Sequence, residues 1–273
     1  MKRAALLVAL LSLSLPAAAP AASRARLRTL ILTGEIDSQY HDWRASTAFL
    51  RDLLERTGRF DVHVEEHVAG ISATTLGPFD LLILNYNGPR WGPAAESAVE
   101  QFVRQGKGLL SFHGVTYGPF YGMVFAENKW QAGPGQGWKA YPELIGARWE
   151  VANIGHARRH VFTVVWKNRE HPISRGLPPS FIANDELYHR LDLLPGVTVL
   201  ATAFDDPSIG GTGHDEPIIW CRPFGSGRTV HLTLGHDVSA LSQPGVSTAF
   251  ARGAEWAATG AVTLPVRHRQ KEK

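Results

Sequence analysis

Residues 80–114 read DLLILNYNGPRWGPAAESAVEQFVRQGKGLLSFHG, and the pattern changes twice along them. Residues 80–86 are apolar and β-rich, as in a strand that is buried on both faces of a sheet. Pro93 suits the first position of a helix, which we expect to continue to about Gln105. A Gly-Lys-Gly turn then leads into a second apolar run at residues 109–112. Two strands joined through a helix are typical of parallel strands in one sheet.

The same strand–helix–strand order occurs earlier in the chain. Residues 27–33 and 60–66 predict strands, and residues 44–57 between them have the apolar spacing of a helix. Two such units indicate an α/β protein with a doubly wound, mainly parallel sheet and helices on both faces. Further strands are expected at residues 160–166, 197–203, 216–222 and 228–234, followed by a closing helix at residues 246–258. Because the chain has no internal repeat or low-complexity linker, we expect a single domain at residues 23–273, with its core at about residues 27–259.

The first 22 residues have the composition of a secretory signal peptide. Lys2 and Arg3 precede an apolar run at residues 4–15, and small residues follow at 17–22. The run is shorter than the roughly 20 apolar residues that span a bilayer, although an uncleaved membrane anchor is the alternative. We therefore expect cleavage near Ala22 and export to the periplasm or the extracellular space, with no membrane association of the mature chain.

The charge of the chain argues against nucleic-acid binding, and its cysteine content argues against a cysteine nucleophile. Without Lys2 and Arg3, the 28 basic residues fall to 26 against 25 acidic ones, and no basic stripe is interleaved with aromatic residues. Nucleic-acid binding is therefore not expected. Cys221 is the only cysteine, so the chain has no internal disulfide. Its position in a predicted strand favours a buried structural thiol over a nucleophile.

Three histidines stand at the expected ends of strands, where ligands bind in sheets of this kind. His41 lies in the loop after the first strand, His113 ends the fourth, and His236 follows the strand at residues 228–234. A single histidine is more often a hydrogen-bonded scaffold residue than a ligand, and these wide spacings match no short metal motif. If His41 and His236 meet a carboxylate in space, they are candidate ligands for a divalent metal such as Zn²⁺ or Mn²⁺.

A second cluster, DELYH at residues 185–189, can supply acid–base chemistry. Neighbouring side chains of a strand face opposite sides, so only one of Asp185 and Glu186 is expected to reach a cleft. A carboxylate near a histidine can serve as a general acid or base, and Glu186 and His113 are the candidates for this catalytic role. A solvated acidic turn or the start of a helix is the alternative.

Aromatic side chains are frequent in the expected loops. Trp43, Trp91, Trp130 and Trp138 lie mostly outside the predicted strands and helices, and the last two belong to a Gly- and aromatic-rich segment at residues 117–141. Flat aromatic rings pack well on the apolar faces of sugars, and loops of this length are often functional. The four tryptophans are therefore candidate carbohydrate-binding residues, with loop packing as the alternative.

Several catalytic motifs of common α/β folds are absent. The chain has no Gly-x-Ser-x-Gly elbow, and His113 stands near the position where the turn after the fourth strand would carry a nucleophilic cysteine. The turn after the first strand lacks the glycines of a phosphate loop or a dinucleotide fingerprint. We therefore do not expect acyl transfer through a serine or a cysteine.

Several short segments of this chain occur together, in one order, in a known family. They are HDW at residues 41–43, GKGLLSFHG at 106–114, HPI at 171–173 with GLP at 176–178, DELY at 185–188, PIIW at 217–220, and residues 225–237 ending in LGHD. By this series the chain resembles the ThuA-like, or trehalose utilisation, family over about residues 27–259. The resemblance implies a flavodoxin-like fold of the class I glutamine amidotransferase-like superfamily, without the amidotransferase cysteine. It also implies a link to the catabolism of trehalose and other disaccharides, alongside 3-keto-sugar chemistry.

The positions that match the family are His41, His113, Glu186, Tyr188 and His236, so the resemblance adds Tyr188 to the catalytic candidates. The long aromatic segment departs from the family pattern and leaves the size of the substrate open. The export signal separates this chain from cytoplasmic members of the family.

Two functions from different classes follow. The first is an enzyme (a lyase, isomerase or hydrolase) acting on a disaccharide or a 3-keto-glycoside, with Glu186 or His113 as the base and a metal or a charged histidine stabilising the enolate. The alternative is a non-catalytic carbohydrate-binding protein in which Trp130 and Trp138 stack on sugar rings. The partner in both cases is a small carbohydrate. An amidase-type hydrolase of the wider fold is disfavoured because the nucleophile is missing.

Overall fold

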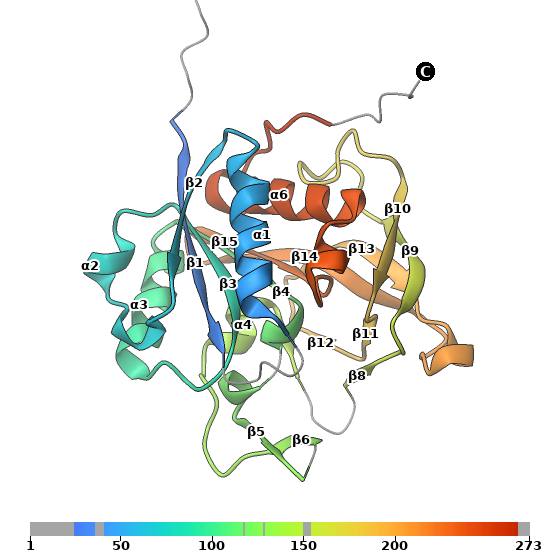
Figure 1. The fold of residues 1–273 in the computed structure, drawn as a ribbon, viewed down its shortest axis with the longest axis horizontal. Coiled ribbons are helices and arrows are strands. Elements are labelled where there is room, and N and C mark those ends of the chain that lie inside the picture. The colour runs from blue at the N-terminus through green and yellow to red at the C-terminus, as the bar shows by residue number, and fades with distance from the viewer. Residues whose placement is uncertain (1–24, 36–40, 117, 128, 150–153, 267–273) are drawn as a thin grey trace, which may run out of the picture.

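The computed structural model describes residues 25–35, 41–116, 118–127, 129–149 and 154–266. Its centre is a nine-stranded sheet with the order β10-β9-β13-β14-β15-β4-β3-β1-β2 (Figure 1). The strands of this sheet are β1 (Leu27–Glu35), β2 (Phe60–Glu65), β3 (Leu81–Asn87), β4 (Gly108–Phe112), β9 (His160–Trp166), β10 (Ser180–Asp185), β13 (Thr198–Phe204), β14 (Asp215–Phe224) and β15 (Gly227–Leu232). Two-stranded ribbons pair β5 (Met123–Ala126) with β6 (Lys129–Ala132), β7 (Ala147–Arg148) with β12 (Asp192–Leu193), and β8 (Gly155–His156) with β11 (Tyr188–His189).

One half of the sheet is parallel. β2, β1, β3, β4 and β15 are neighbours in that order, and each pairs in parallel with the next. The four strands predicted before residue 113 occur within a few residues of their expected limits, so the α/β fold with a mainly parallel, flavodoxin-like sheet is confirmed. Because the strands are parallel, their carboxyl ends meet at one edge of the sheet, and we call this edge the carboxyl edge.

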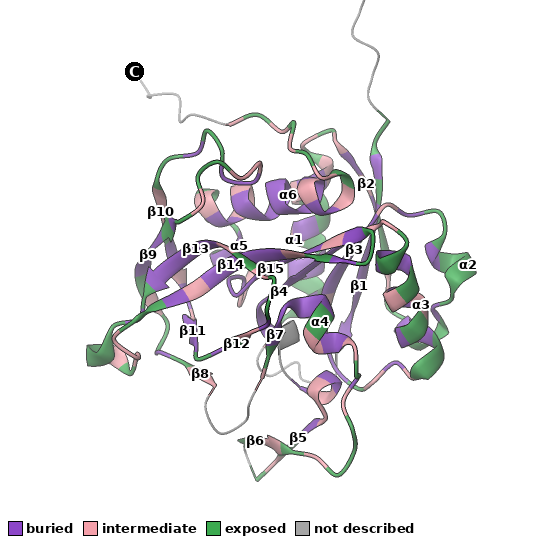
Figure 2. Ribbon diagram, turned by 180° about the vertical axis from the view of Figure 1, so that it is seen from behind, coloured by how far each residue is buried: buried purple, intermediate pink, exposed green. Residues whose placement is uncertain are grey.

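Helices cover both faces of the sheet, as its apolar strands require. The helices are α1 (Trp43–Glu55), α2 (Ala73–Leu76), α3 (Pro93–Arg104), α4 (Tyr141–Ile145), α5 (Val238–Leu241) and α6 (Pro244–Thr259), with 3-10 turns at Val68–Gly70, His113–Thr116, Pro119–Tyr121 and Pro207–Ile209. Leu50 of α1 and Phe250 of α6 belong to the core on one face, whereas Val99 of α3 and Leu144 of α4 belong to the core on the other. The central strands are accordingly buried along most of their length (Figure 2).

The other half of the sheet is antiparallel. β14 pairs antiparallel with β15 and β13, and β9 pairs antiparallel with β13 and β10. As a result β14 and β9 run against the remaining strands, while β13 and β10 point in the same direction as the parallel half. β10, which the sequence did not predict as a strand, therefore ends at the carboxyl edge. Its last residue is Asp185, directly before Glu186.

The segment at residues 117–141, expected to be one long loop, contains regular structure. β5 and β6 pair as an antiparallel hairpin, which stands away from the sheet in Figure 1. A 3-10 turn at Pro119–Tyr121 precedes it, and α4 begins at Tyr141. The expectation of a loop without secondary structure was therefore wrong. Alternation is hard to recognise in strands of only four residues.

The expected signal peptide, residues 1–22, lies outside the described residues. Within the described part of the chain, none of the helices combines the length and the apolar character that crossing a bilayer would need.

Candidate active site

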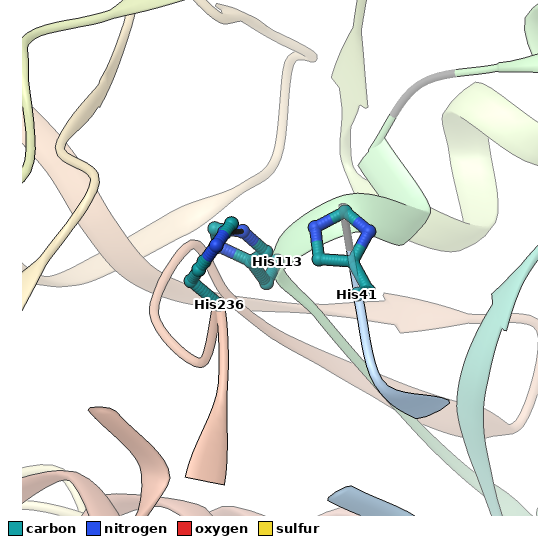
Figure 3. A group of neighbouring side chains, drawn as sticks. All are labelled: His41, His113 and His236. Carbon is teal, nitrogen blue, oxygen red and sulfur yellow. Dashed lines mark hydrogen bonds between the residues drawn. The ribbon is translucent and has the colours of Figure 1, made fainter. Parts of the chain in front are cut away.

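Three histidines from separate segments meet at the carboxyl edge. His41 lies two residues before α1, His113 directly follows β4, and His236 lies in the turn after β15 (Figure 3). Each offers a ring nitrogen, and these atoms all lie within 4.8 Å of one another. His113 Nε2 is 3.1 Å from His236 Nδ1. The structure thus brings together the three residues that strand-end placement singled out.

His113 is held in an uncommon backbone conformation. Its φ of 43° lies in the left-handed region, which few residues other than glycine adopt, and turns the chain sharply after β4. Its Nδ1 donates a hydrogen bond to the Thr233 carbonyl at 3.0 Å, which leaves the lone pair of Nε2 directed at the cluster. Burial, together with His41 and His236, holds the pKa of His113 well below its usual value. His113 is therefore neutral, as a ligand or a base must be.

The ring of His41 lies close to the backbone of Gly114. A Cβ atom on Gly114 would stand 3.0 Å from His41 Cε1, so a larger residue at position 114 would displace the ring. Burial, followed by the charge of His236, lowers the pKa of His41 to about 4. At neutral pH His41 and His113 are both uncharged, which allows their nitrogens to lie close together and to bind a cation.

Glu186 supplies the carboxylate of the cluster. Its Oε2 is 3.3 Å from His236 Nδ1 and 3.6 Å from His113 Nε2. Burial alone would raise the pKa of this carboxyl, but the hydrogen bond with His236 and the nearby histidines bring its pKa below the usual value. The same hydrogen bond raises the pKa of His236. Glu186 is therefore ionised at neutral pH beside the neutral imidazole of His113.

Tyr188, two residues after Glu186, stacks on the ring of His113. Its hydroxyl lies 3.2 Å from His113 Nε2, and the two rings stack with centroids 4.7 Å apart. All five positions that match the family thus converge at one place.

Asp185 points away from the cluster, as alternation along a strand predicts. Its fully buried carboxyl accepts hydrogen bonds from the backbone amides of Gly235 at 2.6 Å, Glu186 at 2.9 Å and His236 at 3.3 Å. These bonds tie the end of β10 to the turn that carries His236. Burial raises the pKa of Asp185 to about 6 in spite of them.

A fourth histidine, His156, also borders Glu186, at 3.8 Å from its Nε2 to Oε2. It lies on β8, opposite Tyr188 in the pairing with β11. The sequence analysis gave this histidine no role. No signal in the sequence could have placed it, because strands of two residues carry no periodicity.

The four tryptophans fall in different environments. Trp91 and Trp138 are buried and pack around Phe120 in the core, so neither presents an open face for a sugar in this structure. Trp43 is buried and lines the same cavity as the three histidines. Trp130 is partly exposed on β6, where its ring edge approaches Gly118. Sugar stacking stays a prediction, with Trp130 the best placed of the four.

A small cavity adjoins the histidines and suits an ion better than a sugar. Its volume is about 30 Å³, and its lining includes His41, His113, His236 and Asn87. Asn87 Oδ1 is buried with no hydrogen-bond partner in the described part of the chain. Neutral imidazoles with an adjacent carboxylate form a donor set that Zn²⁺ and Mn²⁺ accept. The residues present therefore fit a divalent metal, with Glu186 next to it as an acid–base group.

Comparison with known proteins identifies the family of the chain and agrees with its fold. The sequence profile of the family described as ThuA, trehalose utilisation, matches residues 28–257. The structure is similar to that of a ThuA-like protein from Parabacteroides merdae ATCC 43184, with a TM-score of 0.73 and 25% identity over 89% of this chain and 93% of the other. A ThuA-like protein from Bacteroides uniformis ATCC 8492 follows, with a TM-score of 0.67 and 19% identity over 90% of this chain and 97% of the other.

A cytoplasmic protein from Salmonella typhimurium shares the fold at a TM-score of 0.57 and 12% identity, over 85% of this chain and 98% of the other. A search among curated proteins gives no match.

Proposed function

Because this chain belongs to the ThuA, or trehalose utilisation, family, we propose that it is a carbohydrate-active enzyme that cleaves 3-keto-glycosides by acid–base chemistry. The observation that carries the proposal is the contact of one ionised carboxylate, Glu186, with the neutral His113 and the hydrogen-bonded His236. An ionised base beside groups that can stabilise an oxyanion is what proton abstraction next to a carbonyl requires.

The proposed reaction begins at the carbon between the ketone and the glycosidic bond. Glu186 takes the proton from C2, and the electron pair of that C–H bond forms a C2=C3 double bond while the C3 oxygen becomes an enolate. His236, with its raised pKa, lies within reach of Glu186 and can donate a hydrogen bond to that oxygen. Alternatively, a divalent metal held by His41, His113 and His236 would supply Lewis acidity to that oxygen in place of the His236 hydrogen bond.

Elimination then releases the second sugar. The C3 carbonyl re-forms, the electron pair makes a C1=C2 double bond, and the C1–O glycosidic bond breaks. The leaving oxygen takes up one proton, and Glu186 loses the proton that it gained. The products are a free alcohol or sugar and an unsaturated keto-sugar, with no oxidant or reductant consumed.

Turnover of matched substrates tests this proposal. Purified protein, stripped of metal and reloaded with Zn²⁺ or Mn²⁺, is incubated with 3-keto-disaccharides and with the parent disaccharides, and release of the free sugar is followed. We expect cleavage of the ketones only. Glu186→Gln should lower the rate by about 10²–10⁴-fold, the usual contribution of a general base. Glu55→Gln, a surface change on α1 beside Arg51, is the control and should have no effect.

Binding of the parent disaccharides without turnover of any ketone would contradict the proposal and support a carbohydrate-binding protein instead. Full activity in a His113→Ala, Glu186→Ala double variant would also contradict it.

The proposal includes export of the mature enzyme, which rests on the basic, apolar and small-residue order of the first 22 residues. Mass spectrometry of the protein from fractionated cells tests it. A mature chain that begins near Ser23 and lies outside the cytoplasm is expected, and a full-length cytoplasmic chain would contradict export.

A further inference from the structure

His156 stands at the outer side of the candidate active site. Exposure of the side chains rises from 1% for His113 to 18% for Glu186 and 40% for His156. A reaction that abstracts a proton at Glu186 places the reacting ring near the buried histidines. The released part of the substrate has to leave towards solvent, which is the side where His156 lies.

The orientation of His156 suits proton transfer. Its Nδ1 donates a hydrogen bond to the Ala157 carbonyl at 2.9 Å, so Nε2 is the free nitrogen and faces Glu186 Oε2 at 3.8 Å. His113 is oriented in the same way, through Nδ1 and a carbonyl. A histidine fixed by one nitrogen presents the other to a substrate in a defined direction.

The ribbon that carries His156 is anchored from its other side. Tyr188 pairs with His156 and contacts His113, whereas the next residue, His189, bonds Asp205 Oδ2 through Nδ1 at 2.7 Å inside the protein. A Cβ on Gly155 would stand 3.2 Å from His189 Nε2, so the glycine lets β8 lie directly on this buried pair. His156 is thereby held at a fixed place relative to His113.

From these contacts we infer that His156 is the general acid that protonates the leaving oxygen when the glycosidic bond breaks. The inference rests on the proposed function and names a residue beyond those that match the family. In the step, the Nε2–H bond of the imidazolium breaks and its proton joins the leaving oxygen as the C1–O bond breaks. Glu186 holds the proton taken from C2, and its transfer to His156 Nε2 restores both groups for the next cycle.

The dependence of the rate on the leaving group tests the inference. A nitrophenolate departs without help from an acid, whereas a sugar alkoxide needs a proton. We expect His156→Gln to lower cleavage of a 3-keto-disaccharide by about 10²-fold or more and cleavage of a 4-nitrophenyl 3-keto-glucoside by less than about five-fold. The control is His160→Gln, because the His160 side chain bonds the Arg158 carbonyl and contacts Phe162, and it is not part of the proposed machinery.

Exchange of the C2 proton gives a second measurement. It distinguishes a role of His156 in protonating the leaving group from a structural role, which would affect both steps. In D₂O, His156→Gln should still exchange this proton of the 3-keto-disaccharide at close to the wild-type rate, because Glu186 performs that step. Equal losses on both leaving groups, no loss on either, or a parallel loss of exchange would overturn the inference. Wild-type protein that cleaves neither substrate would instead contradict the proposed function itself.

Discussion

β4 and β15 in the parallel half of the sheet and β10 in the antiparallel half all end at the carboxyl edge, but they deliver different chemistry there. The turns after β4 and β15 carry His113 and His236, and His41 follows β1 of the same half. The end of β10 leads into Glu186 and then into the β8–β11 ribbon with Tyr188. The parallel half thus supplies imidazole nitrogens, and the antiparallel half supplies the carboxylate and the phenol.

This difference suggests that the two halves of the sheet have different roles. A cation bound by neutral imidazoles would depend on the parallel half, whereas proton transfer would depend on the antiparallel half. Asp185 connects the two, because it belongs to β10 and accepts the amides of Gly235 and His236. Variants that affect one half at a time can separate these roles.

The largest expected effect comes from removing the ligands of the parallel half. His41→Ala with His236→Ala should weaken Zn²⁺ or Mn²⁺ binding by more than the roughly 10–100-fold typical of a group outside the coordination sphere. Metal analysis after dialysis measures the bound ion. Glu186→Gln should keep its metal and lose activity, and an exposed pair, His63→Ala with His67→Ala, serves as the control. Metal lost from Glu186→Gln but kept in the double histidine variant would reverse the proposed division.

Loss of the connection that Asp185 makes between the two halves should have a smaller effect than loss of the histidines. Asp185→Asn replaces one acceptor oxygen of the buried amides by an NH₂ group. It should lower the free energy of unfolding by about 1–3 kcal/mol at pH 5, where the pKa of about 6 leaves the carboxyl mostly uncharged. Urea denaturation measures the change. Asp192→Asn, at an exposed ion pair with Arg148, should stay within about 0.5 kcal/mol of wild type. Equal stabilities of the two variants would show that Asp185 does not join the halves.

A histidine of the parallel half outside the site predicts a pH effect. Burial lowers the pKa of His231 to about 3, while its ordinary value is 6.5. Between these values the unfolded chain binds a proton that the folded chain does not. The contribution of the neutral His231 to the free energy of unfolding is therefore fully present above pH 6.5. It is lost as the pH falls towards 3, by up to about 1.4 kcal/mol per pH unit.

Replacing His231 by Phe, together with its partner Ser111 by Ala, should flatten this slope without affecting activity. Denaturation at pH 4, 5 and 6 gives the slope. Asp185, with its raised pKa, has an effect of opposite sign in this range, so the difference from wild type is the quantity to compare. An unchanged slope would show that His231 is not neutral in the folded protein.

Two glycine substitutions should have the smallest effects, and each should affect a different property of the site. Gly114→Ala presses on His41, and Gly155→Ala presses on His189 beneath the β8–β11 ribbon. Each should cost about 1 kcal/mol of local packing, or roughly five-fold in the affected step. The first should weaken metal binding, and the second should slow catalysis with metal bound. Calorimetric titration and turnover distinguish them, and identical behaviour would argue against separate roles for the halves.

How far the sequence could lead also differs between the halves. The apolar runs and helix patterns before residue 113 predicted β1 to β4 and the placement of His41 and His113, because parallel strands have a fixed edge for ligands. The neighbourhood of Glu186 could not be derived in this way. It depends on two changes of strand direction, at β14 and β9, and local sequence patterns do not predict the direction of a strand in a sheet.

The aromatic residues illustrate a second limit. Trp91 and Trp138 stand in segments with the composition of loops, yet both are buried, because they pack on each other and on Phe120 of the 3-10 turn at Pro119–Tyr121. Such packing depends on contacts between distant segments. His156 was out of reach for the same reason, since its position follows from its pairing with Tyr188.

Exchange at C2 of a 3-keto-glycoside in D₂O, followed by proton NMR, tests the central claim most directly, because it reports removal of the proton by Glu186 apart from every later step. The account predicts rapid loss of the C2 proton signal with the metal-loaded wild-type protein and a rate lower by about 10²–10⁴-fold in Glu186→Gln. Exchange at the wild-type rate in Glu186→Gln, or no exchange beyond the uncatalysed rate with wild type, would contradict it.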